Sequence, residues 1–224
     1  MESLTSLGIE TLPLDIQSES SINDCAKKIS RLDILINNAG AAYTMPIADL
    51  SIPEARKLFD SNVWGHIAIT QAFLPLLLKS PKAIVVNHTS VGAGLDISFQ
   101  AVYNPSKAAM FSEILRLELQ PFGILVVELR TGGVKTNVVK NVRVRQPKLP
   151  EGSIYTPAKE LIERALAGEG FEGLGITAEQ WAKEVVGDLA KKTPPPVIWR
   201  GESAWLARIG SVFPFSRLGG LMGW

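Results

Sequence analysis

The sequence lacks the residues on which several classes of protein depend. Among its 224 residues are one cysteine, Cys25, and two histidines. This excludes an internal disulfide framework and leaves no ligand cluster for a metal. Basic residues number 23 and acidic residues 22, so charge gives no reason to expect nucleic-acid binding. No uninterrupted apolar run reaches the roughly 18–20 residues of a membrane-spanning helix. A lone cysteine is typical of a reducing compartment, and we expect a cytoplasmic protein.

Glycine is scarce at the start of the chain, where Gly8 is the only one ahead of Gly40. A G-x-x-x-G-x-G turn is therefore missing from this part. Such a turn lets the backbone approach a pyrophosphate at a helix N-terminus, which favours anions. Any nucleotide-binding interpretation of the sequence has to account for this absence.

The chain is instead rich in alternating signals for strands and helices. Proline within residues 9–16 points to an edge or strand-start position, and Pro75 predicts a kink or break in a long helix. We expect strands at residues 9–16, 32–36, 83–87, 124–129 and 197–199, and helices at residues 18–29, 52–79, 105–120, 155–167 and 177–192. This alternation predicts an α/β fold, a parallel sheet covered on both faces, in a single domain over residues 1–224.

Three polar residues stand out around the predicted strand at residues 83–87. Ser90 follows its end, Tyr103 comes thirteen residues later, and Lys107 four after that. Side chains at i and i+4 share one face of a helix, so a phenol and an ammonium would be neighbours there. A cation favours the phenolate and lowers a phenol pKa from about 10. The group suits proton transfer to or from a carbonyl or alcohol oxygen; alternatively, the tyrosine and lysine are an ordinary helix-surface pair.

These residues resemble the catalytic set of the short-chain dehydrogenase/reductase family. Three further motifs resemble those of the family, and all of them stand in the family's order along the chain: Asn37-Asn38-Ala39-Gly40, Asn62-Val63-Trp64-Gly65 and Thr131-Gly132-Gly133-Val134-Lys135-Thr136. In the last motif threonine stands where the family has proline. Five motifs in order, each in a suitable strand or helix, are a specific match. The last motif and the tail are most similar to fungal reductases that resemble 1-acyldihydroxyacetone-phosphate reductase.

The resemblance implies a Rossmann-like, doubly wound parallel sheet with the family's strand order 3-2-1-4-5-6-7. Residues 9–16 would then be near strand 3, and the chain would lack the first strand, the glycine-rich turn and the second strand. We therefore expect an N-terminally truncated member. Removing those strands would leave unpaired edges in the sheet.

The resemblance also implies catalytic roles. Tyr103 would be the acid/base, and Lys107 would lower its pKa and hold the nicotinamide ribose. Ser90 would orient the substrate oxygen, and Asn62 would hold a water that links Lys107 to solvent. His66 and His88 lack ligand spacing and have no expected role beyond packing.

The implied cofactor is NADP, with NAD possible, because the residues that would choose between them are missing. Asn38 would have a structural role in the sheet. Asp15 would contact adenine or, alternatively, be a turn residue. The cofactor-binding residues would be Asp15, Asn37, Ala39, Gly40, Tyr103, Lys107, Gly132, Val134 and Thr136.

Two regions have a different character. Residues 140–176 pass from a basic, irregular stretch through a helix to a glycine-rich one, and we expect a lobe that covers the substrate. Residues 202–224 form an apolar tail. It is either an interfacial anchor, peripheral on endoplasmic reticulum or lipid droplets, or it packs over the lobe or a second subunit.

The functional hypothesis is an NAD(P)H-dependent oxidoreductase that interconverts a ketone and a secondary alcohol on an apolar substrate, a lipid or a secondary metabolite. A truncated, non-catalytic remnant or binding module that no longer holds the cofactor is the alternative. A third hypothesis is a peripheral membrane scaffold without redox activity. A homo-oligomer is common in the family.

Overall fold

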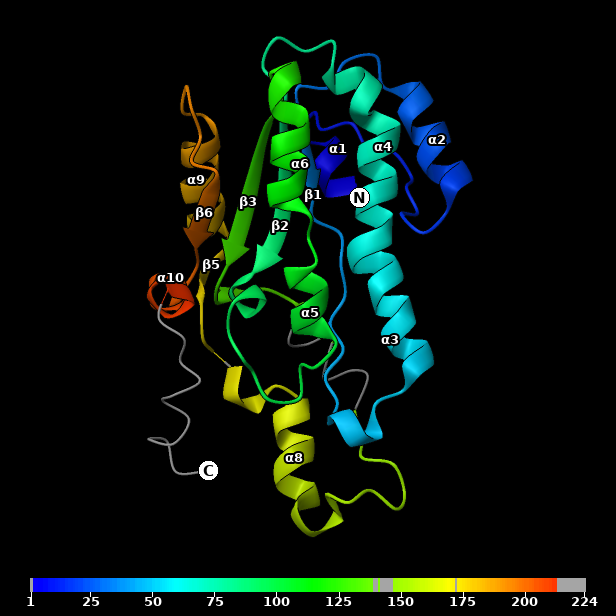
Figure 1. The fold of residues 1–224 in the computed structure, drawn as a ribbon, viewed down its shortest axis with the longest axis vertical. Coiled ribbons are helices and arrows are strands. Elements are labelled where there is room, and N and C mark those ends of the chain that lie inside the picture. The colour runs from blue at the N-terminus through cyan, green and yellow to red at the C-terminus, as the bar shows by residue number, and fades with distance from the viewer. Residues whose placement is uncertain (1, 139–140, 142–146, 172, 213–224) are drawn as a thin grey trace.

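A computed structural model describes residues 2–138, 141, 147–171 and 173–212. Its centre is a parallel sheet with the strand order β1-β2-β3-β6 (Figure 1). The strands are β1 (Ile34–Asn37), β2 (Ile84–Ser90), β3 (Leu125–Thr131) and β6 (Val197–Arg200). The register aligns Ile34 with Ile84 and Ile84 with Leu125, so the carboxyl ends of the strands lie together.

Helices cover both faces of the sheet. The described helices of eight or more residues are α2 (Glu19–Lys28), α3 (Ile52–Phe59), α4 (Gly65–Leu77), α6 (Ser112–Leu119), α8 (Lys159–Leu166), α9 (Ala178–Leu189) and α10 (Ala204–Val212). Val85 and Val126 pack with α4 and α6 on one face, and Val86 and Val127 pack with α9 on the other. This side-to-side alternation follows from the two-residue period of a strand. The expected Rossmann-like α/β fold, a parallel sheet between helices, is confirmed.

The strand expected at residues 9–16 is wrong, because this segment runs as coil. Its residues Leu12 and Ile16 pack against the hydrophobic cluster formed by α2 and α4. Among the described residues no strand pairs with the outer edge of β1. A strand exists only through its ladder of hydrogen bonds, and in the family's order residues 9–16 would pair with strands that this sheet does not contain.

Two predicted helices are interrupted. The helix expected at residues 52–79 widens into a π turn over Asp60–Trp64 between α3 and α4. It also runs through Pro75 and ends at Leu77. Because the proline lies in the last turn, it removes few of the hydrogen bonds of the helix. The helix expected at residues 105–120 is two helices, α5 (Tyr103–Ala108) and α6, and the chain turns at Ala109 between them. The helices at residues 18–29 and 177–192 are confirmed, with N-caps Ser18 and Thr177.

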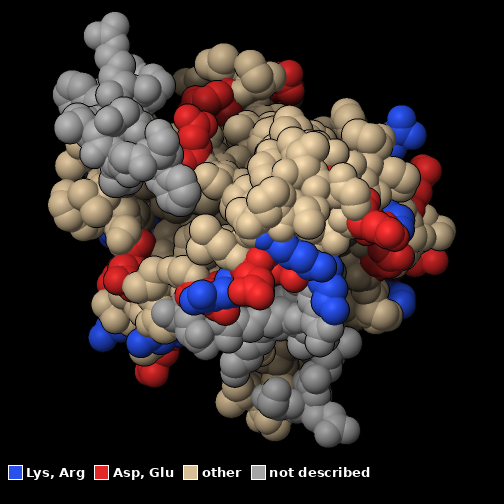
Figure 2. Space-filling view, turned by 90° about the horizontal axis from the view of Figure 1, so that it is seen from below, with Lys and Arg blue, Asp and Glu red and all other residues tan. Residues whose placement is uncertain are grey.

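The α8 helix stands beyond the carboxyl end of the sheet (Figure 1). It buries Ile162 and Leu166 against Met45 and Phe99, and the Thr44 hydroxyl donates to the carbonyl of Leu166 at 3.2 Å. Seen from this end, uncharged side chains cover most of the middle of the surface (Figure 2). Parts of the predicted lobe, residues 140, 142–146 and 172, lie outside the described residues, as does the tail after residue 212.

A short pair of parallel strands, β4 (Val134–Lys135) and β5 (Ile176–Thr177), joins the loop after β3 to the start of α9. None of the helices in the described ranges is long and apolar enough to cross a membrane.

Candidate active site

The carboxyl end of β2 carries a serine that is hydrogen-bonded to a tyrosine. Ser90 is the last residue of β2, and its Oγ accepts a hydrogen bond from the N–H of Gly92 at 3.1 Å. Tyr103 is the first residue of α5, and its phenol is hydrogen-bonded to the Ser90 side chain. The strand end and the helix start thus bring two hydroxyl groups together, as the sequence predicts.

Lys107 lies in the last turn of the same short helix, so the predicted i, i+4 relation to Tyr103 is confirmed. Its side chain is not on the surface: Lys107 is 7% exposed. The Nζ donates to the main-chain carbonyl of His88, 3.2 Å away. Burial lowers the pKa of Lys107 to about 8. The alternative of an ordinary helix-surface pair is therefore wrong.

The expectation that Lys107 lowers the pKa of Tyr103 does not hold in this structure. Burial raises the pKa of Tyr103 above its usual 10, because the phenolate loses hydration, and the hydrogen bond from Ser90 opposes this only in part. The Lys107 ammonium is bonded to the His88 carbonyl instead. In this state Tyr103 is a neutral phenol, which can donate a proton.

Asn62 ties the π turn to the loop after β1 and to α5. It is fully buried. Its Oδ1 accepts from the N–H of Ala41 at 2.9 Å, and its Nδ2 donates to the Ala41 carbonyl and to Ser106 Oγ, each at 3.0 Å. π turns are often found at functional sites. In this structure the Asn62 side chain is hydrogen-bonded to the main chain of Ala41. The water expected at Asn62 stays a prediction.

The two asparagines at the end of β1 differ in burial, and the buried one is Asn37. Asn37 is 2% exposed, and its Nδ2 donates to Thr70 Oγ1 at 3.0 Å and to Asn87 Oδ1 at 2.9 Å. It therefore has the structural role in the sheet that was expected of Asn38. Asn38 is exposed, and its Oδ1 is hydrogen-bonded to His88 Nδ1.

Gly40 shows how tightly the turn after β1 meets the site. A Cβ at this position would lie 3.1 Å from Asn62 Oδ1 and 3.4 Å from Lys107 Nζ. Ala39 contributes its carbonyl oxygen, which is 2.6 Å from His66 Nε2. A side chain at position 40 would therefore displace Asn62 or the buried ammonium of Lys107, and glycine avoids this.

The predicted cofactor-binding residues after β3 lie on the loop that follows this strand. Gly132 donates its N–H to the Arg200 carbonyl at 2.8 Å, and a Cβ there would meet the carbonyl oxygen of Glu202 at 2.3 Å. Val134 is held in β4, while Thr136 is exposed. The loop thus returns to the carboxyl edge of the sheet.

Asp15 is not joined to these groups by any contact among the described residues. Its Oδ1 accepts from the N–H of Gln17 at 2.9 Å, and its own N–H donates to Ser21 Oγ at 2.9 Å. These are the contacts of a turn residue ahead of α2. The adenine contact stays a prediction.

The two histidines have polar roles that the sequence reasoning missed. The His88 Nε2 is 2.7 Å from Thr131 Oγ1, and its ring stacks on Trp181 at a centroid distance of 5.3 Å. His66 is fully buried beside Ala39. Burial first, and then the charge of Lys107, lower the pKa of His88 to about 4; burial also lowers that of His66 to about 4, against the raising effect of its bond to Ala39.

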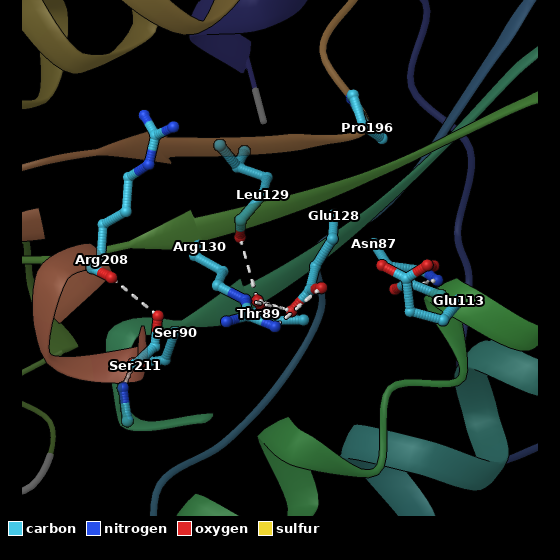
Figure 3. Close-up of polar contacts among 12 residues, drawn as sticks. Asn87, Thr89, Ser90, Glu113, Glu128, Leu129, Arg130, Pro196, Arg208 and Ser211 are labelled. Atoms are coloured by element: carbon cyan, nitrogen blue, oxygen red, sulfur yellow. Dashed lines mark hydrogen bonds and ion pairs between the residues drawn. The ribbon is translucent and has the colours of Figure 1, made fainter. Parts of the chain in front are cut away.

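A partly buried ion pair between Arg130 and Glu128 lies beside Thr89, the residue before Ser90 (Figure 3). Arg130 Nε is 2.7 Å from Glu128 Oε1, and Thr89 Oγ1 donates to the same oxygen at 3.2 Å. The Arg130 guanidinium also lies over the Trp199 ring, 4.9 Å from its centroid. Because the Glu128 carboxylate is matched by these donors, we assign the group a structural role that ties β2, β3 and β6 together.

The comparisons with known proteins agree with this geometry. The family model for short chain dehydrogenases matches residues 2–147. A short-chain dehydrogenase/reductase of Pestalotiopsis microspora is 49% identical over 217 residues, which cover 96% of this chain and 75% of the relative. The NADPH-dependent 1-acyldihydroxyacetone phosphate reductase of Schizosaccharomyces pombe is 34% identical and covered to 77%, with 96% of this chain aligned.

Among solved structures, a short-chain dehydrogenase from Streptomyces avermitilis superposes with a TM-score of 0.76 at 25% identity. The match covers all of this chain and 83% of that one. The chain has Ser90 at a strand end, Tyr103 and Lys107 on one helix, and a buried Asn62. Its sequence and its fold both match one group of enzymes. The chain belongs to the short-chain dehydrogenase/reductase family.

Proposed function

We propose that this protein interconverts a ketone and a secondary alcohol with NADPH, NADH being the second possibility, and that Tyr103 is the acid/base. The observation that carries the proposal is the Ser90–Tyr103 hydrogen bond next to the buried ammonium of Lys107. Family membership supports redox chemistry, and the S. pombe relative is named as NADPH-dependent. A short-chain dehydrogenase of Burkholderia cenocepacia, of the same fold with a TM-score of 0.72, was solved in complex with NADP.

In the direction of reduction, the carbonyl carbon would receive the hydride that NADPH supplies when it is bound. Ser90 holds the carbonyl oxygen by a hydrogen bond, and Tyr103 gives that oxygen its phenolic proton. The C=O bond becomes a C–OH group, and the phenolate that remains keeps the Ser90 hydroxyl as a hydrogen-bond donor until solvent returns the proton. The raised pKa of Tyr103 suits this step, because the phenol enters it protonated.

Lys107 and Tyr103 would hold the nicotinamide ribose, and glycine at position 40 adds no side chain beside the Lys107 ammonium. Gly132, Val134 and Thr136 would contact the nicotinamide carboxamide and the phosphates. Asn62 would support the site by holding Ala41 and Ser106 in place.

An apolar substrate is proposed from the lobe at the carboxyl end of the sheet. The α8 helix and the segment before it bury Leu149, Ile162 and Leu166 together with Phe99. Apolar side chains on the same lobe stay open to solvent, with Ile154 72% exposed. A surface of this kind offers a polar ligand no hydrogen bonds in exchange for the hydration it loses, and it therefore favours an apolar one.

Calorimetric titration of the 224-residue chain with NADPH and NADH, followed by a screen of apolar ketones, tests the proposal. We expect binding of NADPH by the wild type and by Tyr103→Phe, but turnover by the wild type alone. Tyr43→Phe is the matched control, because the Tyr43 hydroxyl only accepts a bond from the Ser51 N–H, and it should keep turnover. A folded protein that binds neither nucleotide would overturn the proposal in favour of a non-catalytic remnant.

A further inference from the structure

The His88 side chain joins two loops that border the proposed cofactor site. Its Nδ1 is hydrogen-bonded to Asn38, at the turn after β1. Its Nε2 is 2.7 Å from Thr131 Oγ1, at the end of β3. β2, which carries His88, lies between these two strands in the sheet. One imidazole therefore bridges the carboxyl ends of three neighbouring strands.

The two partners determine the form of the ring. Asn38 Oδ1 can only accept, so His88 Nδ1 carries the proton and donates it. Nε2 is then an acceptor, and the Thr131 hydroxyl donates to it. Of the two neutral tautomers, only the Nδ1–H form can make both bonds, because Nε2–H would leave Nδ1 without a proton to donate to Asn38 Oδ1.

Two further contacts hold His88. Trp181, from α9, stacks on its ring, and the main-chain carbonyl of His88 accepts from Lys107 Nζ. Lys107 and His66 are the charged and titratable groups that act on His88, and both disfavour a second proton on the ring. The ring is therefore fixed in place and in protonation state.

We propose that His88 is a positioning residue for the nucleotide: it sets the spacing between the turn at Asn38 and the loop that begins at Thr131, where the family's motif has a proline instead. The hydroxyl of Thr131 makes this bridge possible, and proline could not. The inference rests on the proposed cofactor, and it assigns functions to His88, Thr131 and Asn38 that the catalytic set does not include.

Two variants remove the bridge from opposite ends. His88→Phe keeps a ring to stack on Trp181 but loses both nitrogens, and Thr131→Val keeps the shape of threonine but loses the hydroxyl. Each should raise the dissociation constant for NADPH about five- to tenfold, the value of one or two net hydrogen bonds. The double variant should be little weaker than either single one, because both remove the same bridge. Thr131→Ser, which restores the hydroxyl, should bind as the wild type does.

The turnover number at saturating NADPH should change far less than the dissociation constant, because Ser90, Tyr103 and Lys107 are untouched. A second readout needs no nucleotide: nitrogen-15 NMR of the free protein should show a protonated Nδ1 and an unprotonated Nε2 for His88, and Thr131→Val should shift the Nε2 signal.

The outcomes separate this inference from the proposed function. If the wild type binds no NADPH, the proposed function fails, while the NMR tautomer still tests the bridge. If the wild type binds NADPH and both single variants bind it equally well, or if their effects add fully in the double variant, His88 does not position the cofactor site. An Nε2–H tautomer would overturn the bridge itself.

Discussion

Acidification should weaken the fold through its two histidines, of which His66 is buried and His88 is partly buried. The pKa values of His66 and His88 are each lowered from 6.5 to about 4, chiefly by burial. Between these values the unfolded chain binds protons that the folded one does not. The free energy of unfolding therefore falls as the pH drops from 6.5 to 4, and this contribution is flat outside that window.

The magnitude follows from proton linkage. One differing proton corresponds to roughly 1.4 kcal/mol per pH unit, so each histidine removes about 3 kcal/mol across the window. This is a large share of the ~5–15 kcal/mol that stabilises a typical domain. Cooperative loss of structure is thus expected at a mildly acidic pH.

Urea unfolding at half-unit steps from pH 7 to pH 4, followed by circular dichroism, measures this effect. His88→Phe and His66→Leu each remove one of the two protons, so the pH slope of each variant between pH 6.5 and 4.5 should be lower than that of the wild type by up to about 1.4 kcal/mol per pH unit. Carboxylates contribute equally to all three proteins and cancel in the comparison. Equal slopes for the wild type and both variants would refute the reasoning.

Three further predictions concern single positions. Because burial holds the pKa of Lys107 at about 8, NADPH affinity should fall severalfold between pH 7 and pH 9, whereas Lys107→Met should show no such change in calorimetry. Asn62→Ala leaves the Ala41 main chain unpaired and should cost about 1–3 kcal/mol in urea unfolding; no loss would mean that water replaces the amide. Leu129→Ala, at a 1% exposed position, should cost about 2–5 kcal/mol, and a smaller loss would mean that the core collapses around it.

Much of the catalytic group could be predicted because its signals are local. The Tyr103–Lys107 spacing depends only on helix geometry, and Ser90 follows directly from a strand end. The burial of Asn37 could also have been predicted by local reasoning of this kind. Leu35 and Asn37 are two apart in β1 and share one face, so Asn37 had to be buried with Leu35.

The remaining features depend on partners far away in the sequence. His88 contacts Trp181 and Thr131, which no local pattern joins to it. The coil at residues 9–16 has a strand-like composition, but pairing decides whether a strand forms. The raised pKa of Tyr103 reflects burial, which the i, i+4 spacing to Lys107 does not reveal.

The most direct test of the central claim is transfer of deuterium from NADPH labelled at the reactive carbon of its nicotinamide. The wild type and Tyr103→Phe would be incubated with the best ketone of the screen, and the alcohol analysed by mass spectrometry. We expect deuterium on the carbinol carbon with the wild type and none with Tyr103→Phe. Equal transfer by both proteins, or no transfer by a wild type that binds NADPH and every ketone offered, would contradict it.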